Sequence, residues 1–87
     1  MTRTTPVKTT MNAIQREYLH NVRRALKVAD AVRFNRAAYN QQARSAQSYW
    51  TLFLKSTANT RFQENVNRMK NFLNSHDIRG ALTLASP

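Results

Sequence analysis

The stretch RFNR, residues 33–36, lies between two apolar helical patterns and decides how the chain folds. A seven-residue apolar repeat passes through it, which favours one helix from about residue 11 to 55 that forms a coiled-coil dimer. Asn35, however, is a good N-cap for a second helix, and Arg36 would be a costly residue in a buried seam. We therefore predict a break at Asn35 between two antiparallel helices, with the long coiled-coil helix as the alternative.

The segment before RFNR has the pattern of an amphipathic helix, with apolar residues at spacings of three and four. Its apolar face consists of Met11, Ile14, Tyr18, Leu19, Val22, Ala25, Leu26, Val28, Ala29 and Val32. Its opposite face consists of Arg16, His20, Arg23, Arg24, Lys27 and Asp30. The pattern predicts a helix over residues 11–34 whose apolar face packs against the rest of the chain.

Two further helices are expected after RFNR, and each has its own apolar stripe. The stripe of the helix predicted over residues 36–55 consists of Tyr39, Ala43, Ala46, Trp50, Phe53 and Leu54. The stripe of the helix predicted over residues 61–79 consists of Phe62, Val66, Met69 and Leu73. Thr60 and Gln63 form a capping-box pattern before this last helix. Gly80 is expected to end it in a left-handed turn, although a stop nearer Ser75 also fits.

These patterns predict an all-α fold class, in the form of a small three-helix bundle or an extended helical hairpin. Residues 1–10 are expected to be a flexible basic arm, residues 11–79 the helical domain, and residues 80–87 an apolar tail that can pack back on the bundle. At 87 residues the chain is one domain with a thin core. Neither strand-like alternation nor a hairpin turn dipeptide is present.

The charge of the chain is strongly positive, with 14 Lys and Arg residues against 4 Asp and Glu residues and a formal net charge of +10. Such a chain is attracted to polyanions, and nucleic acid is the commonest polyanionic partner. An acidic protein surface would attract it in the same way.

Cysteine is absent, which excludes disulfides, thiol nucleophiles and thiolate metal ligands. The first ten residues, MTRTTPVKTT, contain no apolar segment of the kind that signal peptides carry. The apolar patch YWTLFL, residues 49–54, is far shorter than the ~20 residues of a transmembrane helix. We therefore expect a cytoplasmic protein, which for a phage-encoded chain means the host cytoplasm.

An enzyme needs side chains that converge, and the sequence shows no such set. The acidic residues are never three or four positions apart, so no two of them share one turn of a helix. They are Glu17, Asp30, Glu64 and Asp77. Neither histidine belongs to a metal-binding pattern, and no glycine-rich phosphate loop is present. We expect no enzymatic activity, no metal and no cofactor.

The basic face of the first helix is the strongest candidate for a binding surface. Its cations recur at helical spacings, so they are expected to form a ridge that can follow a phosphate backbone. Arginine suits this role because its planar guanidinium grips a phosphate through two hydrogen bonds. Other basic residues extend the charge along the chain and the arm. The candidate contacts are Arg3, Lys8, Arg16, Arg23, Arg24, Lys27, Arg33, Arg36 and Arg44.

These observations favour a non-enzymatic nucleic-acid-binding protein that contacts backbone phosphates of DNA or RNA. The alternative is a small regulator or inhibitor, phage- or plasmid-encoded, that docks on the acidic surface of a larger nucleic-acid-processing machine. Binding to a membrane surface is disfavoured because the bundle uses the apolar face of the first helix, and a homo-oligomer is left open. Tyr49, Trp50 and Phe53 can stack on bases, but their helical spacing is more typical of core residues.

Overall fold

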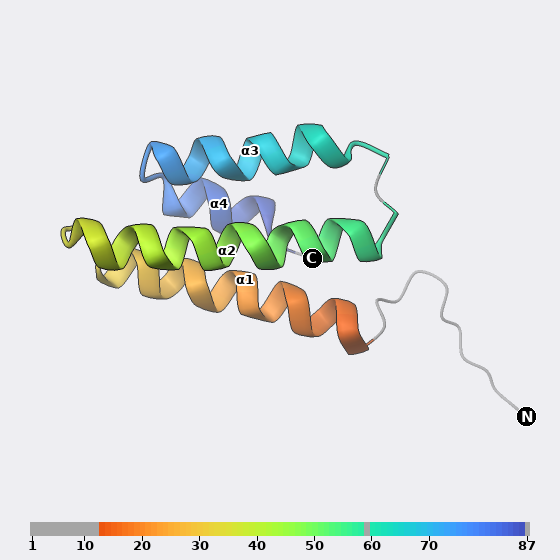
Figure 1. Cartoon of the computed structure of the whole chain (residues 1–87), viewed down its shortest axis with the longest axis horizontal. Coiled ribbons are helices and arrows are strands. Elements are labelled where there is room, and N and C mark those ends of the chain that lie inside the picture. The colour runs from red at the N-terminus through yellow and green to blue at the C-terminus, as the bar shows by residue number, and fades with distance from the viewer. Residues whose placement is uncertain (1–12, 59, 87) are drawn as a thin grey trace, which may run out of the picture.

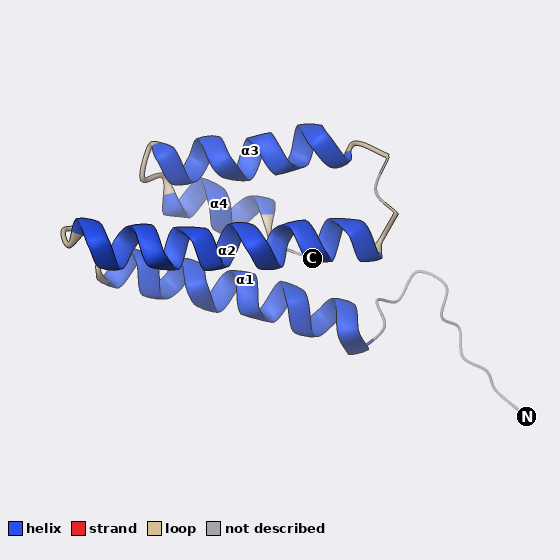
Figure 2. Cartoon of the chain, in the orientation of Figure 1, coloured by secondary structure: helices blue, strands red, loops and turns tan. Residues whose placement is uncertain are grey.

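The computed structural model describes residues 13–58 and 60–86 of the chain. Over these residues it shows four α-helices and no strand (Figure 2). They are α1 (Ala13–Ala31), α2 (Arg36–Ser56), α3 (Phe62–Asn74) and α4 (Ile78–Leu84). The predicted all-α fold class is therefore confirmed, while the predicted N-terminal arm lies outside the described residues.

Helix α2 is central to the fold, because it packs against α1 on one side and against α3 on the other (Figure 1). α1 and α2 form an antiparallel hairpin, and α3 runs back along α2. The short helix α4 packs against both α1 and α3; in the view of Figure 1 it appears between α3 and α2 and farther from the viewer. This arrangement leaves the front of α2 uncovered between its two neighbours.

The chain breaks at Asn35, as predicted, and the alternative of one continuous helix over residues 11–55 is wrong. Asn35 has an extended backbone (φ −106°, ψ 103°), and its side-chain oxygen accepts a hydrogen bond from the Ala38 N–H at 3.0 Å. The Asn35 N–H donates to the Val32 carbonyl at 2.9 Å, which closes the turn. Local capping outweighs the heptad repeat here, because Arg36 is then exposed at the start of α2 instead of buried in a seam.

The hydrophobic core lies between the apolar faces of α1, α2 and α3, and α4 closes it on one side. Its buried residues are Leu19, Val22, Ala25, Leu26, Ala29, Tyr39, Ala46, Trp50, Leu54, Met69, Leu73, Ile78, Ala81 and Ala85. Two residues predicted for the apolar face of α1 are instead exposed, Ile14 by 61% and Val28 by 40%. Both lie at the margin of the stripe that α2 and α4 cover, and Met11 lies outside the described residues.

The third helix ends at Asn74 and not at residue 79, because a different residue takes the left-handed position. His76 adopts a φ of 59°. Its N–H donates to the Leu73 carbonyl at 3.1 Å, and the Asp77 N–H donates to the Phe72 carbonyl at 2.8 Å. These two bonds make a Schellman motif, which usually carries glycine at the position of His76. A left-handed backbone is unfavourable for a residue other than glycine. Stacking of the His76 ring on Tyr39, with ring centroids 4.0 Å apart, offsets part of this free-energy cost.

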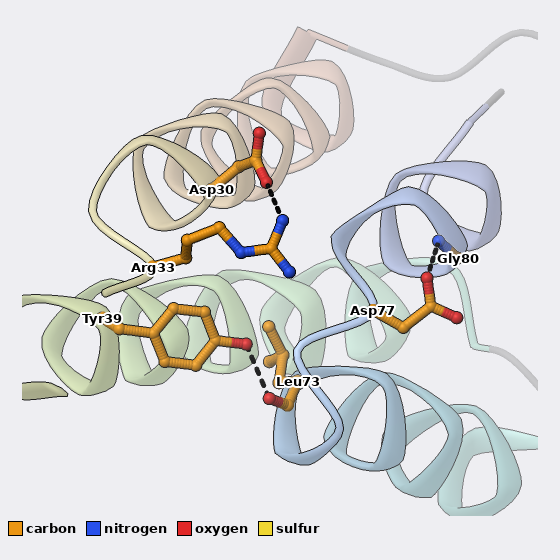
Figure 3. Close-up of polar contacts among 6 residues, drawn as sticks. All are labelled: Asp30, Arg33, Tyr39, Leu73, Asp77 and Gly80. Atoms are coloured by element: carbon orange, nitrogen blue, oxygen red, sulfur yellow. Dashed lines mark hydrogen bonds and ion pairs between the residues drawn. The ribbon is translucent and has the colours of Figure 1, made fainter. Parts of the chain in front are cut away.

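The expectation that Gly80 would end the third helix is wrong, because Gly80 lies in the first turn of a fourth helix. Asp77 caps α4, and its Oδ1 accepts a hydrogen bond from the Gly80 N–H at 2.9 Å (Figure 3). Gly80 does not have a positive φ. A Cβ atom at this position would lie 2.6 Å from Cε1 of Phe72, so glycine is needed for the close approach of α4 to α3.

The predicted capping box of Thr60 and Gln63 is also not formed. α3 begins at Phe62, so its N-cap position falls on Arg61, one residue after Thr60. Arg61 makes no side-chain capping hydrogen bond. α3 packs on the core through its apolar stripe, in which Met69 and Leu73 are buried, without the predicted capping box.

Tyr39 joins α2 to the end of α3 through a buried hydroxyl group. Its O–H donates to the Leu73 carbonyl at 2.6 Å (Figure 3). Burial raises the pKa of Tyr39 above its usual range, and the nearby positive charge of Arg33 opposes this in part. The folded state therefore favours the neutral hydroxyl, which alone can donate this hydrogen bond.

We expect the fold to lose stability at high pH through Tyr39. Because folding raises the pKa of Tyr39, its contribution to the free energy of unfolding is complete below the pKa of the unfolded state, about 10. This contribution is lost as the pH rises through the pKa of the folded state. Urea unfolding of the wild type and of Tyr39→Phe at about pH 8 and about pH 11 measures this loss. The variant should be about 1 kcal/mol less stable at the lower pH, because it lacks the hydrogen bond. It should also lose less stability between the two pH values, and an equal loss in both proteins would contradict the assignment.

Candidate polyanion-binding surface

The basic residues of α1 differ in their surroundings, and Arg23 and Arg24 lie next to different parts of the fold. The Arg23 side chain is half-buried, and its Nη1 donates to the Leu82 carbonyl at 3.3 Å and to the Ser86 hydroxyl at 3.1 Å. Arg24, the next residue, lines a groove between α1 and α2. Arg23 therefore ties α1 to the C-terminal end of the fold, which makes it less accessible to an external phosphate than we predicted.

Other predicted contacts at α1 and its end are exposed to solvent. Arg16 and Lys27 lie on the solvent side of α1. Arg33 forms an ion pair with Asp30 at 3.5 Å, with 43% and 55% of the two side chains exposed (Figure 3). An ion pair this exposed contributes little to stability and leaves most of the guanidinium donors in water. Arg3 and Lys8 lie outside the described residues.

A groove between α2 and α3 brings two cations together, Arg44 of α2 and Lys70 of α3. Its volume is about 240 Å³, and its other lining residues are Asn40, Ala43, Gln47, Leu73 and Asn74. None of these described lining residues is acidic, so no carboxylate in the groove neutralises the two cations. Lys70 was not among the predicted contacts. Helical spacing could have identified it as a candidate, because it places Lys70 on the polar side of the third helix, one turn before Asn74.

A second groove, between α1 and α2, lies on the other flank of α2 and has a volume of about 310 Å³. Its lining residues are Asn21, Arg24, Ala25, Val28, Gln42, Ser45 and Tyr49. Here too the described lining contains a cation and several hydrogen-bonding groups but no carboxylate. α2 itself carries Arg36, Arg44 and Lys55 and no acidic residue along its whole length.

The two grooves and the exposed side of α2 between them make one continuous region, which we call the α2 surface. The residues of α2 that lie between the two groove linings around the helix, such as Gln41 and Ser48, are exposed, so solvent-exposed α2 side chains join one groove to the other. The polar residues that define the α2 surface are Asn21, Arg24, Asn40, Gln42, Arg44, Ser45, Lys70 and Asn74. Of the predicted contacts, the structure thus brings Arg24 and Arg44 to this surface, together with Lys70.

The acidic residues lie away from the grooves of the α2 surface. Asp30 and Asp77 line a separate cavity of about 410 Å³ at the end of α1 and the start of α4. Both have structural roles there, since Asp30 pairs with Arg33 and Asp77 caps α4. Glu17 and Glu64 are exposed and line neither groove. The separation of charge leaves the α2 surface purely cationic in its grooves.

Other kinds of site find no support within residues 13–58 and 60–86. No group of three or more His, Cys, Asp or Glu side chains is placed there to hold a metal ion. In the same part of the chain, no helix combines the length and the apolar character needed to cross a membrane. Comparisons with known protein families, with curated proteins and with solved structures found no match.

Proposed function

We propose that this protein binds nucleic acid without catalysis, through the α2 surface. The observation that carries the proposal is the placement of Arg24, Arg44 and Lys70 in two grooves whose described linings hold no carboxylate. Cations without a protein counter-charge hold mobile anions instead, and a phosphate backbone that displaces those anions gains affinity from their release, as it does from release of its own counterions. The guanidinium groups add bidentate hydrogen bonds to phosphate oxygens.

The shape of the α2 surface favours a ligand with several phosphate groups over a single small anion. The two grooves lie on opposite flanks of α2, so they are separated by about the 10–12 Å diameter of a helix. A nucleic-acid strand that crosses α2 can place one phosphate in each groove. A free phosphate ion can use only one groove at a time, and the net charge of +10 attracts longer polyanions more strongly.

The neutral side chains of the α2 surface suit the same ligand. Asn21, Asn40, Gln42 and Asn74 offer both hydrogen-bond donors and acceptors beside the cations. Such groups bind phosphate and sugar oxygens, and carboxamides can also pair with base edges. Phosphate contacts position a strand without reading its sequence, so we expect affinity for DNA and RNA with weak sequence preference.

The test is a pair of double variants that remove equal charge, one from the grooves of the α2 surface and one from residues that line neither groove. Arg44→Gln with Lys70→Gln removes two cations from the α2 surface. Arg68→Gln with Arg79→Gln removes two exposed cations elsewhere and is the matched control. Binding of a labelled oligonucleotide is measured by fluorescence anisotropy between about 50 and 300 mM salt. The first variant should flatten the slope of log K against log salt by about 1.4 to 1.8, and the control should leave it close to the wild-type value.

Two results would contradict this assignment. If both double variants changed the slope equally, the net charge and not the α2 surface would govern binding. If wild-type affinity did not depend on salt, backbone phosphates would not be the ligand. A protein complex recovered with the chain after nuclease treatment would favour the alternative partner, an acidic surface on another protein.

A further inference from the structure

Phe34 is an aromatic side chain that the fold holds out in solvent. Its side chain is 95% exposed at the turn between α1 and α2. The turn is closed on both sides of it, by the 2.9 Å hydrogen bond from the Asn35 N–H to the Val32 carbonyl and by the 3.0 Å cap between Asn35 and Ala38. These hydrogen bonds hold the turn in a conformation that keeps Phe34 outside the core. The aromatic side chain therefore has no packing role in this fold.

Two arginines, Arg33 and Arg36, flank Phe34 in the sequence. The guanidinium carbon of Arg33 lies over the ring, 5.8 Å from its centroid. Arg36 is exposed two residues further on, and Asp30, which pairs with Arg33, is the acidic residue nearest in sequence. With the guanidinium over one face of the ring, the other face is open to a flat partner. An open aromatic face between two arginines combines the two features that single-strand-binding proteins use, a stacking platform and phosphate-binding cations.

The turn leads directly into the α2 surface. Arg36, Asn40 and Arg44 follow one another at intervals of four residues, so they lie along one side of the first turns of α2. Asn40 and Arg44 already line the groove between α2 and α3. A strand that starts at Phe34 can therefore continue along polar and cationic side chains for about 12 Å, at 1.5 Å per residue, into that groove.

We propose that Phe34 stacks on an unpaired base of a single-stranded nucleic acid, while Arg33 and Arg36 bind the neighbouring phosphates. This inference rests on the proposed function and narrows it to a substrate class. In a duplex both faces of each internal base are covered by its neighbours, whereas a single strand can turn a base out onto a ring. An apolar pocket on a partner protein fits less well, because it would have to accept two arginines beside the ring.

Phe34→Leu and Phe34→Trp together test the stacking. Leucine keeps an apolar side chain but lacks a flat ring, and tryptophan keeps the ring. Each protein is titrated with a labelled oligothymidylate and with the same strand paired to its complement. We expect Phe34→Leu to bind the single strand roughly 5- to 150-fold more weakly, with an unchanged salt slope because no cation is removed. Phe34→Trp should bind like the wild type, and its added indole emission should be quenched on binding.

The outcomes separate this inference from the proposed function. If Phe34→Leu binds the single strand as tightly as the wild type while the double variant of Arg44 and Lys70 still flattens the salt slope, the stacking is wrong and nucleic-acid binding stands. Equal weakening on single strand and duplex would overturn the single-strand assignment. If the wild type sediments as a dimer and Phe34→Leu sediments as a monomer, Phe34 belongs to a contact between two copies of the chain. That result would also overturn the proposal that Phe34 stacks on a base.

Discussion

Trp50→Ala should lower the free energy of unfolding by about 3–5 kcal/mol, which is a large part of the roughly 4–13 kcal/mol expected for a domain of 87 residues. The Trp50 side chain is only 4% exposed. Its Nε1 donates to the Asn65 carbonyl at 2.9 Å, so the same residue fills the core and ties α2 to α3. Alanine would leave a cavity in a thin core and remove that tie. The variant should therefore be largely unfolded in conditions where the wild type is folded.

Phe34→Ala is the matched control for Trp50→Ala. It truncates another aromatic side chain, but one that is 95% exposed, so the free energy of unfolding should change by no more than about 0.5 kcal/mol. Urea unfolding followed by circular dichroism measures both variants. A Trp50→Ala protein as stable as the wild type would show that Trp50 is not the central core residue that the structure describes.

Removal of α4 should have an effect at least as large. A chain that stops after Asp77 loses Ile78, Ala81 and Ala85, which are 5%, 0% and 1% exposed. It also loses the half-buried residues of α4 and both acceptors of the Arg23 side chain. Since a fully buried aliphatic side chain contributes about 1.5–3 kcal/mol, the total loss should exceed about 4 kcal/mol. We expect the shortened chain to be helical but without a cooperative thermal transition.

Two point variants in α4 calibrate the truncation. Ile78→Ala should cost about 2–5 kcal/mol, because it truncates a buried side chain between α4 and the core. Thr83→Ala changes an exposed residue of the same helix and should be nearly neutral. Thermal melts followed by circular dichroism compare the three proteins with the wild type. A truncated chain with the wild-type transition would show that α4 does not take part in the core.

The helical hairpin could be predicted from the residues alone because its signals are local. Apolar spacing places α1 and α2, and the side chain of Asn35 caps α2 through a residue only three positions away. The end of α3 could not be predicted in this way. The left-handed position belongs to His76, whose cost is offset by stacking on Tyr39, a residue distant in sequence. The preference of glycine for this position predicted Gly80 instead, but the role of Gly80 is to let α4 approach α3.

The candidate site could be predicted only in part. Helical spacing identifies Arg23 and Arg24 as cations on the polar side of α1. It does not show that Arg23 donates a hydrogen bond to α4 or that Arg24 lines the groove between α1 and α2. Lys70 becomes a candidate only when α3 packs beside α2 and places it across a groove from Arg44. The first helix was predicted over residues 11–34, but α1 ends at Ala31, and the turn that follows leaves the Phe34 ring in solvent.

The amino-acid sequence by itself determined that this protein is helical, where its first two helices meet and that it carries a net charge of +10. These properties follow from composition and from spacings within a few residues. Only the tertiary structure decided which cations line a groove without a carboxylate and which, like Arg23, hydrogen-bond to other parts of the fold. The reason is physical: charge neutralisation depends on distances between side chains of different helices, and those distances exist only once α2 has packed between α1 and α3.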